Sequence, residues 1–209
     1  TTSELFRAMW NTENKATASR PNDLMFVRYL YDWMKQNYFI DESRVYASGQ
    51  SSGGAMSWAC ATYLPDIFTA AAPVSANGLM GNISNDASTM PIPIIAFIGE
   101  QDGTFKGGFG SDDAKATINY WNNRNKTVEK WATYTYMDGG KNCSFRSDLF
   151  TNYVYRNAAG IPMLRAVEVA TKTHAILPSE CFIAWNECFS HFARDKQTGM
   201  LYYDGSIVK

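Results

Sequence analysis

The feature that most constrains the fold of this chain is a serine between glycines, in the run Gly49-Gln50-Ser51-Ser52-Gly53. Residues 44–48 before it have the pattern of a short buried strand, and residues 55–61 after it have that of a helix. A strand, a tight G-x-S-x-G turn and a helix form the context of a nucleophile elbow. We expect the turn to exclude side chains at both flanking glycines and to hold Ser51 in a strained backbone conformation.

The five-residue pattern is weak by itself, because it arises by chance in roughly one chain in ten of this length. The alternative is a flexible loop rich in Gly and Ser, which the flanking strand and helix patterns disfavour. A serine hydroxyl is also a poor nucleophile until a base accepts its proton and a third group orients that base. The elbow interpretation therefore requires an acid and then a histidine further along the chain.

Only two histidines are available as the base. His174 lies in a loop after a strand-like run at residues 164–169, whereas His191 lies in a segment with helical periodicity, residues 181–193. A histidine beside an apolar helical stripe is usually a packing or surface residue, so we predict that His174 is the base. The stripe expected beside His191 consists of Phe182, Trp185, Phe189 and Phe192.

The best candidate for the acid is Asp102. It follows residues 91–98, a continuous apolar run typical of a strand covered on both faces. Functional groups gather at the carboxyl ends of such strands, where a carboxylate can accept a hydrogen bond from an imidazole. Glu100 is the rival acid, and the alternative for Asp102 is an ordinary Asx turn before Gly103.

Strand and helix patterns alternate through the first two-thirds of the chain, which predicts an α/β fold with a mostly parallel sheet flanked by helices. We expect one domain over residues 1–209, since neither a linker nor an internal repeat is visible. Helices are expected at residues 23–38, after the elbow, at 112–122 and from Ser179. The first of them has an apolar stripe through Phe26, Val27, Leu30 and Met34. Further strands are expected at 68–74, 93–98, 131–137, 153–156 and 163–169.

Composition excludes several classes of partner. The net charge of −1 gives no reason to expect a nucleic-acid ligand, and the absence of an 18-residue apolar run argues against a membrane span. The glycine-rich run 106–110 fits neither phosphate-binding motif, so no cofactor is expected. The cysteines lack the spacing of a zinc site, and their pairing stays open between a disulfide through Cys143 and free thiols; they are Cys60, Cys143, Cys181 and Cys188.

Several of these segments resemble the α/β-hydrolase superfamily, and within it the group of feruloyl esterases, acetyl xylan esterases and polyhydroxybutyrate depolymerases. The segment Asp41–Met56 is similar to the elbow segment of that group, and Ala71–Ser75 to the strand that follows it. Ile98–Asp102 matches the place of the acid. Thr173–Pro178 matches the block around the histidine, although Thr173 and Ile176 stand where the group carries Gly and Trp.

The resemblance implies a serine ester hydrolase with Ser51, Asp102 and His174 as its catalytic residues. The Ser52 backbone N–H would be the first oxyanion donor. It implies feruloyl or acetyl esters of plant cell-wall polysaccharide as substrates and a secreted or periplasmic location, although no signal peptide is visible. Loop residues that could shape the acyl pocket, or be ordinary loop residues, are Asn77, Leu79, Met80 and Phe105.

One departure from the group concerns its N-terminal part. The group has several strands and a His-Gly loop before the helix expected at residues 23–38, and that loop supplies the second oxyanion donor. Here only about 20 unpatterned residues precede this helix. The chain therefore resembles the C-terminal two-thirds of the fold, and we expect an N-terminal segment or a second chain to complete it. Two other functions stay open: a prolyl-oligopeptidase-like serine peptidase and a non-catalytic domain that retains the elbow.

Overall fold

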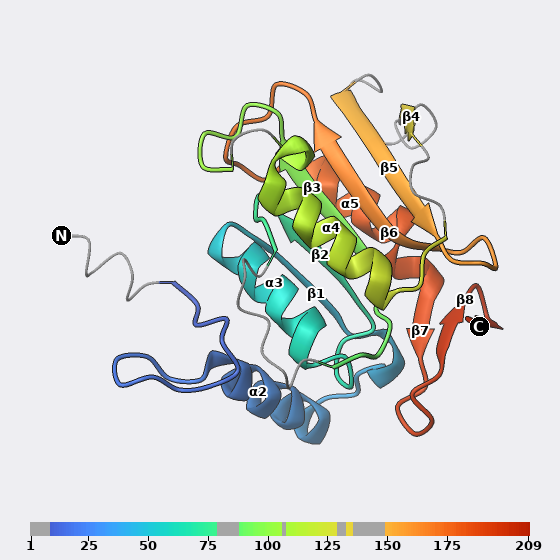
Figure 1. Cartoon of the computed structure of the whole chain (residues 1–209). Helices are drawn as coiled ribbons and strands as arrows, with labels where there is room; N and C mark the ends of the chain where they lie inside the picture. Colours follow the sequence, from blue (N-terminus) through green and yellow to red (C-terminus); the bar gives the residue numbers. More distant parts are fainter. Residues whose placement is uncertain (1–8, 79–87, 106–107, 129–132, 136–148) are drawn as a thin grey trace.

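A twisted six-stranded sheet dominates the computed structural model, which describes residues 9–78, 88–105, 108–128, 133–135 and 149–209 (Figure 1). The strands lie in the spatial order β1-β2-β3-β6-β5-β4. In chain order they are β1 (Tyr46–Gln50), β2 (Ala70–Val74), β3 (Ile94–Gly99), β4 (Thr133–Thr135), β5 (Phe150–Arg156) and β6 (Pro162–Val169). The expected strands are therefore confirmed, with shifted ends.

The sheet is parallel where strands and helices alternate and antiparallel where they do not. β1, β2, β3 and β6 pair in parallel, whereas β5 pairs antiparallel with both β6 and β4. β5 and β6 form an antiparallel hairpin around the turn at residues 157–160. β1, which leads into Ser51, lies at the edge of the sheet formed by the described residues.

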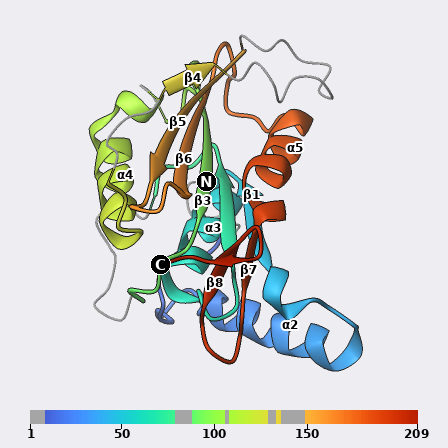
Figure 2. The ribbon, with the colours of Figure 1, turned by 90° about the vertical axis from the view of Figure 1, so that its right-hand side faces the viewer.

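Apolar side chains of β3 point alternately to the two faces of the sheet. Ile94 and Ala96 pack into one core with Trp58 of α3 (Ser52–Tyr63) and Trp121 of α4 (Asp112–Arg124). Ile95 and Phe97 pack into a second core on the other face, with α5 (Pro178–Glu187) and the C-terminal strands. Figure 2 shows α4 and α5 on opposite sides of the sheet. Burial on both faces explains why the sequence of β3 is apolar without interruption.

Helix α2 (Asp23–Asn37) begins as predicted, because the Asn22 side chain accepts a hydrogen bond from the Met25 N–H at 3.2 Å. The predicted apolar stripe is wrong in part. Leu24 is buried, but Phe26 and Leu30 are 53% and 46% exposed. α2 packs against the core through Leu24, Val27 and Tyr31, and of these only Val27 belongs to the predicted stripe. Periodicity therefore identified the helix but only part of the face that the described residues cover.

The chain after α5 differs from the prediction of a helix through residues 181–193. α5 ends at Glu187, a 3-10 turn covers Phe189–His191, and Phe192 begins a three-stranded antiparallel sheet. The expected stripe is split, since Phe182 and Trp185 are exposed while Phe189 and Phe192 are buried. Phe189, in the 3-10 turn, stacks on Tyr46 of β1 at 4.5 Å between ring centroids. The new sheet consists of β7 (Phe192–Arg194), β8 (Leu201–Tyr203) and β9 (Ser206–Ile207).

Candidate active site

Ser51 lies in a sharp turn between β1 and α3. Its backbone has φ 57° and ψ −117°, a conformation that L-residues rarely adopt. The turn is held because the Ser51 N–H donates to the Val74 carbonyl at 3.0 Å and the Ser51 carbonyl accepts from the Ala55 N–H at 2.9 Å. The strained backbone expected of an elbow is therefore present at this serine.

The expectation that both flanking glycines exclude side chains is only half right. A Cβ at Gly49 would lie 2.6 Å from the backbone of Gly53, and one at Gly54 would lie 2.6 Å from the Val74 carbonyl oxygen. A Cβ at Gly53 would meet no atom within 4 Å. Gly49 and Gly54 are therefore the positions where close packing of the helix against the strands demands glycine.

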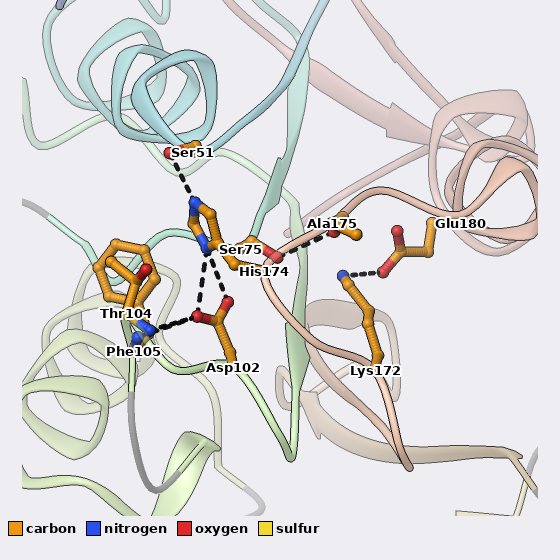
Figure 3. Close-up of polar contacts among 9 residues, drawn as sticks. All are labelled: Ser51, Ser75, Asp102, Thr104, Phe105, Lys172, His174, Ala175 and Glu180. Atoms are coloured by element: carbon orange, nitrogen blue, oxygen red, sulfur yellow. Dashed lines mark hydrogen bonds and ion pairs between the residues drawn. The ribbon is translucent and has the colours of Figure 1, made fainter.

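Three predicted residues meet at the carboxyl ends of the parallel strands (Figure 3). His174 Nε2 lies 2.8 Å from Ser51 Oγ, and His174 Nδ1 lies 3.0 Å and 3.2 Å from the two Asp102 carboxylate oxygens. A carboxylate only accepts hydrogen bonds, so Nδ1 carries the proton and Nε2 is left to accept from the Ser51 hydroxyl. This arrangement can transfer a proton from the hydroxyl to the imidazole.

Asp102 is held by the loop that follows β3. Its side chain is fully buried, and Oδ1 accepts from the backbone N–H groups of Thr104 and Phe105 at 2.9 Å and 3.0 Å. Burial alone would raise the pKa of Asp102, but the hydrogen bonds from His174 and these two N–H groups outweigh it and lower the pKa. The rival acid, Glu100, is exposed on the same loop. Geometry thus favours Asp102 as the partner of the imidazole.

Ser52 is the first residue of α3, so its backbone N–H has no acceptor within the helix. The helix dipole adds a partial positive charge at the same end. The Ser52 side chain also accepts a hydrogen bond from the Trp10 backbone N–H at 3.0 Å, so the chain before α2 lies beside the elbow. Sequence analysis missed this contact, because residues 1–20 show no periodic pattern.

Only part of the predicted acyl pocket falls within the described residues. The Phe105 ring packs against His174, with 5.7 Å between ring centroids, and Asn77 is half-buried on the loop after β2. Leu79 and Met80 lie outside the described residues. Of the predicted pocket residues that the structure describes, Phe105 contacts the three-residue cluster.

Other groups in the described part of the chain offer no alternative chemistry. His191 pairs with Asp204 rather than with Ser51. No cluster of three or more His, Cys, Asp or Glu side chains among the described residues could hold a metal ion, and no described helix is long and apolar enough to cross a membrane. Cys60, Cys181 and Cys188 are free thiols, whereas Cys143 lies outside the described residues.

Comparisons with known proteins point to hydrolases. A family model described as the prolyl oligopeptidase family matches residues 4–107. Poly(3-hydroxyalkanoate) depolymerase C of Paucimonas lemoignei is 28% identical over 184 residues, which cover 79% of this chain and 43% of that protein. Feruloyl esterase B of Piromyces equi is 30% identical over 146 residues, covering 64% of this chain and 26% of that protein. The chain thus spans less than half the length of the curated relatives it matches.

The fold comparison agrees with these matches. The solved structure of acetyl xylan esterase from Aspergillus awamori superposes with a TM-score of 0.61 at 14% identity, over 85% of this chain and 72% of that one. The chain therefore has the fold of the α/β-hydrolases. Among proteins of this fold, the chain is similar to the polyhydroxyalkanoate depolymerase and feruloyl esterase group, as its elbow segment indicated.

Proposed function

We propose that this chain is a serine carboxylic ester hydrolase that acts through an acyl-enzyme. The observation that carries the proposal is the continuous hydrogen-bonded series from Ser51 through His174 to Asp102. Asp102 lies where it can accept from His174 Nδ1, which leaves Nε2 to accept from the Ser51 hydroxyl, and that hydroxyl lies on a strained turn at the N-terminus of a helix. These are the features of an activated nucleophile.

In the proposed reaction, Ser51 Oγ attacks the ester carbonyl carbon while His174 Nε2 takes the hydroxyl proton. The tetrahedral intermediate collapses to an acyl-serine ester, and His174 returns the proton to the leaving alcohol. Water then attacks the acyl group, with His174 again accepting a proton, and releases the acid and free Ser51. Asp102 stays ionised and keeps the imidazole in the tautomer that accepts from Ser51.

The proposed oxyanion hole uses the Ser52 N–H as its first donor. We assign the second donor to an N-terminal segment outside the described residues or to a second chain. Two features of the described part support this assignment: β1 is an edge strand, and the nearby helix α2 exposes large apolar side chains. Losing one donor of such a pair typically costs about 10²–10³ in rate, so the second donor should be required for full activity.

As substrates we propose feruloyl or acetyl esters linked to plant cell-wall polysaccharide, hydrolysed outside the cytoplasm by a secreted or periplasmic protein. The names of the feruloyl esterase and acetyl xylan esterase relatives support this substrate class. The depolymerase relative supports ester hydrolysis in general. Asn77 and Phe105, together with Leu79 and Met80, are the residues that we propose for the acyl pocket.

The test replaces Ser51 with Ala in the full chain and follows hydrolysis of p-nitrophenyl acetate and methyl ferulate. We expect kcat to fall on the order of 10⁶-fold, because the nucleophile itself is lost. Ser48→Ala is the matched control, since Ser48 is an exposed serine of β1 that bonds only to the Ala72 carbonyl. A fluorophosphonate probe should label the Ser48→Ala protein and spare Ser51→Ala. Unchanged turnover by Ser51→Ala would exclude the proposed mechanism.

A second candidate function is a serine peptidase, which the match to the prolyl oligopeptidase family favours. That match spans Ser51 and Asp102 but ends before His174. The same three residues could cleave an amide, with the leaving amine protonated by His174. Comparing kcat/KM for a prolyl p-nitroanilide and for methyl ferulate at equal enzyme concentration distinguishes the two functions. Preference for the amide would overturn the esterase assignment while leaving the serine mechanism in place.

A further inference from the structure

A buried ion pair lies behind the loop that carries His174. Lys172 Nζ and Glu180 Oε1 form a very short contact, and their side chains are 1% and 0% exposed (Figure 3). Burial raises the pKa of Glu180, and the positive charge of Lys172 partly offsets this effect. Removing two charges from water costs about as much as their attraction returns, so such a pair is a poor way to stabilise a fold. Its position therefore calls for a reason other than stability.

The Glu180 carboxylate holds the His174 loop on both sides of the histidine. Oε1 contacts Lys172, two residues before His174, and Oε2 accepts from the Leu177 backbone N–H at 2.7 Å, three residues after it. Only four residues, 173–176, lie between these two attachment points. One carboxylate at the first turn of α5 thus limits where the imidazole can lie.

Two further hydrogen bonds connect the same loop to the strands that carry the other members of the site. The Lys172 carbonyl accepts from the Gln101 N–H at 3.0 Å, next to Asp102. The Ala175 carbonyl accepts from Ser75 Oγ at 3.1 Å, at the end of β2 beside the elbow. The loop is therefore connected at residues 172 and 175 to the ends of β3 and β2.

We propose that Lys172 and Glu180 are positioning residues for the proposed ester hydrolysis, which hold His174 in line between Ser51 and Asp102. This inference rests on the proposed function and deepens it. The pair lies behind the loop and takes no part in proton transfer. Its contribution is to keep Nε2 at hydrogen-bonding distance from Ser51 Oγ, and a misplacement of about 1 Å can cost on the order of 10²-fold in rate.

The decisive variant is Lys172→Met/Glu180→Leu, which removes both charges and keeps similar side-chain volumes. Replacing a buried ion pair by apolar residues is often neutral for stability, but the Leu177 N–H also loses its acceptor, so Tm should fall by a few degrees while the protein stays folded. We expect kcat for p-nitrophenyl acetate to fall roughly 10- to 100-fold with KM within about threefold. A folded double variant with the parent kcat would overturn the proposal.

Glu187→Gln is the matched control, because it weakens the Arg165–Glu187 ion pair (3.0 Å) at the other end of α5. It should leave kcat unchanged. If the double variant does not fold, Ser75→Ala removes a loop hydrogen bond without leaving a buried charge and should lower kcat by several-fold. An unchanged kcat for Ser75→Ala would then count against positioning of this loop.

A proton NMR signal, which does not depend on turnover, tests the positioning role separately from the proposed ester hydrolysis. The Nδ1 proton between His174 and Asp102 should give a low-field proton NMR signal in the parent protein. We expect the double variant to shift or broaden it, and Glu187→Gln to leave it unchanged. If the parent protein hydrolyses no ester yet shows this pattern, the proposed function fails and the positioning role stands. An unaltered signal in the double variant refutes the positioning role.

Discussion

The described part of the chain contains two histidine–aspartate pairs, and among the described residues one of them faces a serine. His174 Nδ1 lies 3.0 Å from Asp102, and His191 Nδ1 lies 2.7 Å from Asp204. The two imidazoles are similarly exposed, at 29% and 33% of their side-chain surface. Neither the pairing nor the exposure distinguishes them.

The difference lies at the other ring nitrogen. His174 Nε2 faces the Ser51 hydroxyl, which can donate, whereas His191 Nε2 lies 2.8 Å from the Asn186 carbonyl oxygen, which can only accept. His191 Nε2 therefore faces an acceptor and has no hydroxyl there from which to take a proton. Its ring stacks on Tyr203 and joins the end of α5 to the β8–β9 turn. A histidine–aspartate pair becomes a candidate base only when its second nitrogen meets a hydroxyl.

The largest effect should follow from a variant that removes the carboxylate acceptor from His174 Nδ1. In Asp102→Asn, the amide can donate to Nδ1, which moves the imidazole proton to Nε2, where it faces Ser51. We expect kcat to fall on the order of 10⁴-fold with little change in KM. Steady-state kinetics with p-nitrophenyl acetate measures both constants. A loss of less than tenfold would show that Asp102 does not set the tautomer.

A smaller effect should follow from displacing the hydroxyl rather than changing the imidazole. The Cβ of Gly49→Ala would lie 2.6 Å from Gly53 backbone atoms, so the turn at Ser51 must shift. We expect kcat/KM to fall about 10²-fold.

Gly53→Ala is the control for this variant, because its Cβ meets open space at the start of α3. It should keep full activity and gain up to about 1 kcal/mol in stability, since alanine favours a helix over glycine. Equal losses in the two variants would contradict the packing argument. Thermal melts and kinetics on both proteins provide the comparison.

A further effect concerns stability against pH. Because the folded state lowers the pKa of Asp102, its ionised form stabilises the fold above the ordinary value of about 3.9. This stabilisation is lost as the pH falls through the lowered pKa. The free energy of unfolding of the parent protein, relative to Asp102→Asn, should therefore decrease as the pH falls below about 4. Urea denaturation at several pH values measures it, and a difference that grows on acidification would be inconsistent with the lowered pKa.

The smallest effect is expected at the second pair. His191→Ala removes the partly exposed side-chain contacts with Asp204 and with the Asn186 carbonyl, which together contribute roughly 1 kcal/mol or less. Tm should fall slightly while kcat and KM stay unchanged. A loss of activity comparable with that of Asp102→Asn would break the distinction between the two histidines.

Much of the fold could be predicted from local pattern. The uninterrupted apolar run at β3 indicates burial on both faces of the sheet, and the change from strand to helix pattern around Ser51 indicates the elbow. The order serine, acid, histidine also indicated which residues to consider. These features are local, because each depends on periodicity or turn chemistry within about 15 residues.

Other features depended on contacts between distant parts of the chain. The expected helix through His191 ends at Glu187, and Phe189 beyond it stacks on Tyr46, some 140 residues earlier in the sequence. The exposure of Phe26 and Leu30 on α2 and the open space at Gly53 likewise depend on which parts of the chain pack next to these residues. Local propensity carries no information about these partners.

By itself, the sequence determined the strained serine turn, the strand that ends near Asp102 and the choice of two histidines. Only the tertiary structure decided between those histidines, since Ser51 and His174 are separated by 123 residues and meet at the sheet edge. It also revealed the ion pair of Lys172 and Glu180, which no periodic pattern in the sequence indicates. The physical reason is that hydrogen-bond geometry depends on distances of a few tenths of an ångström, which the packing of the whole sheet sets.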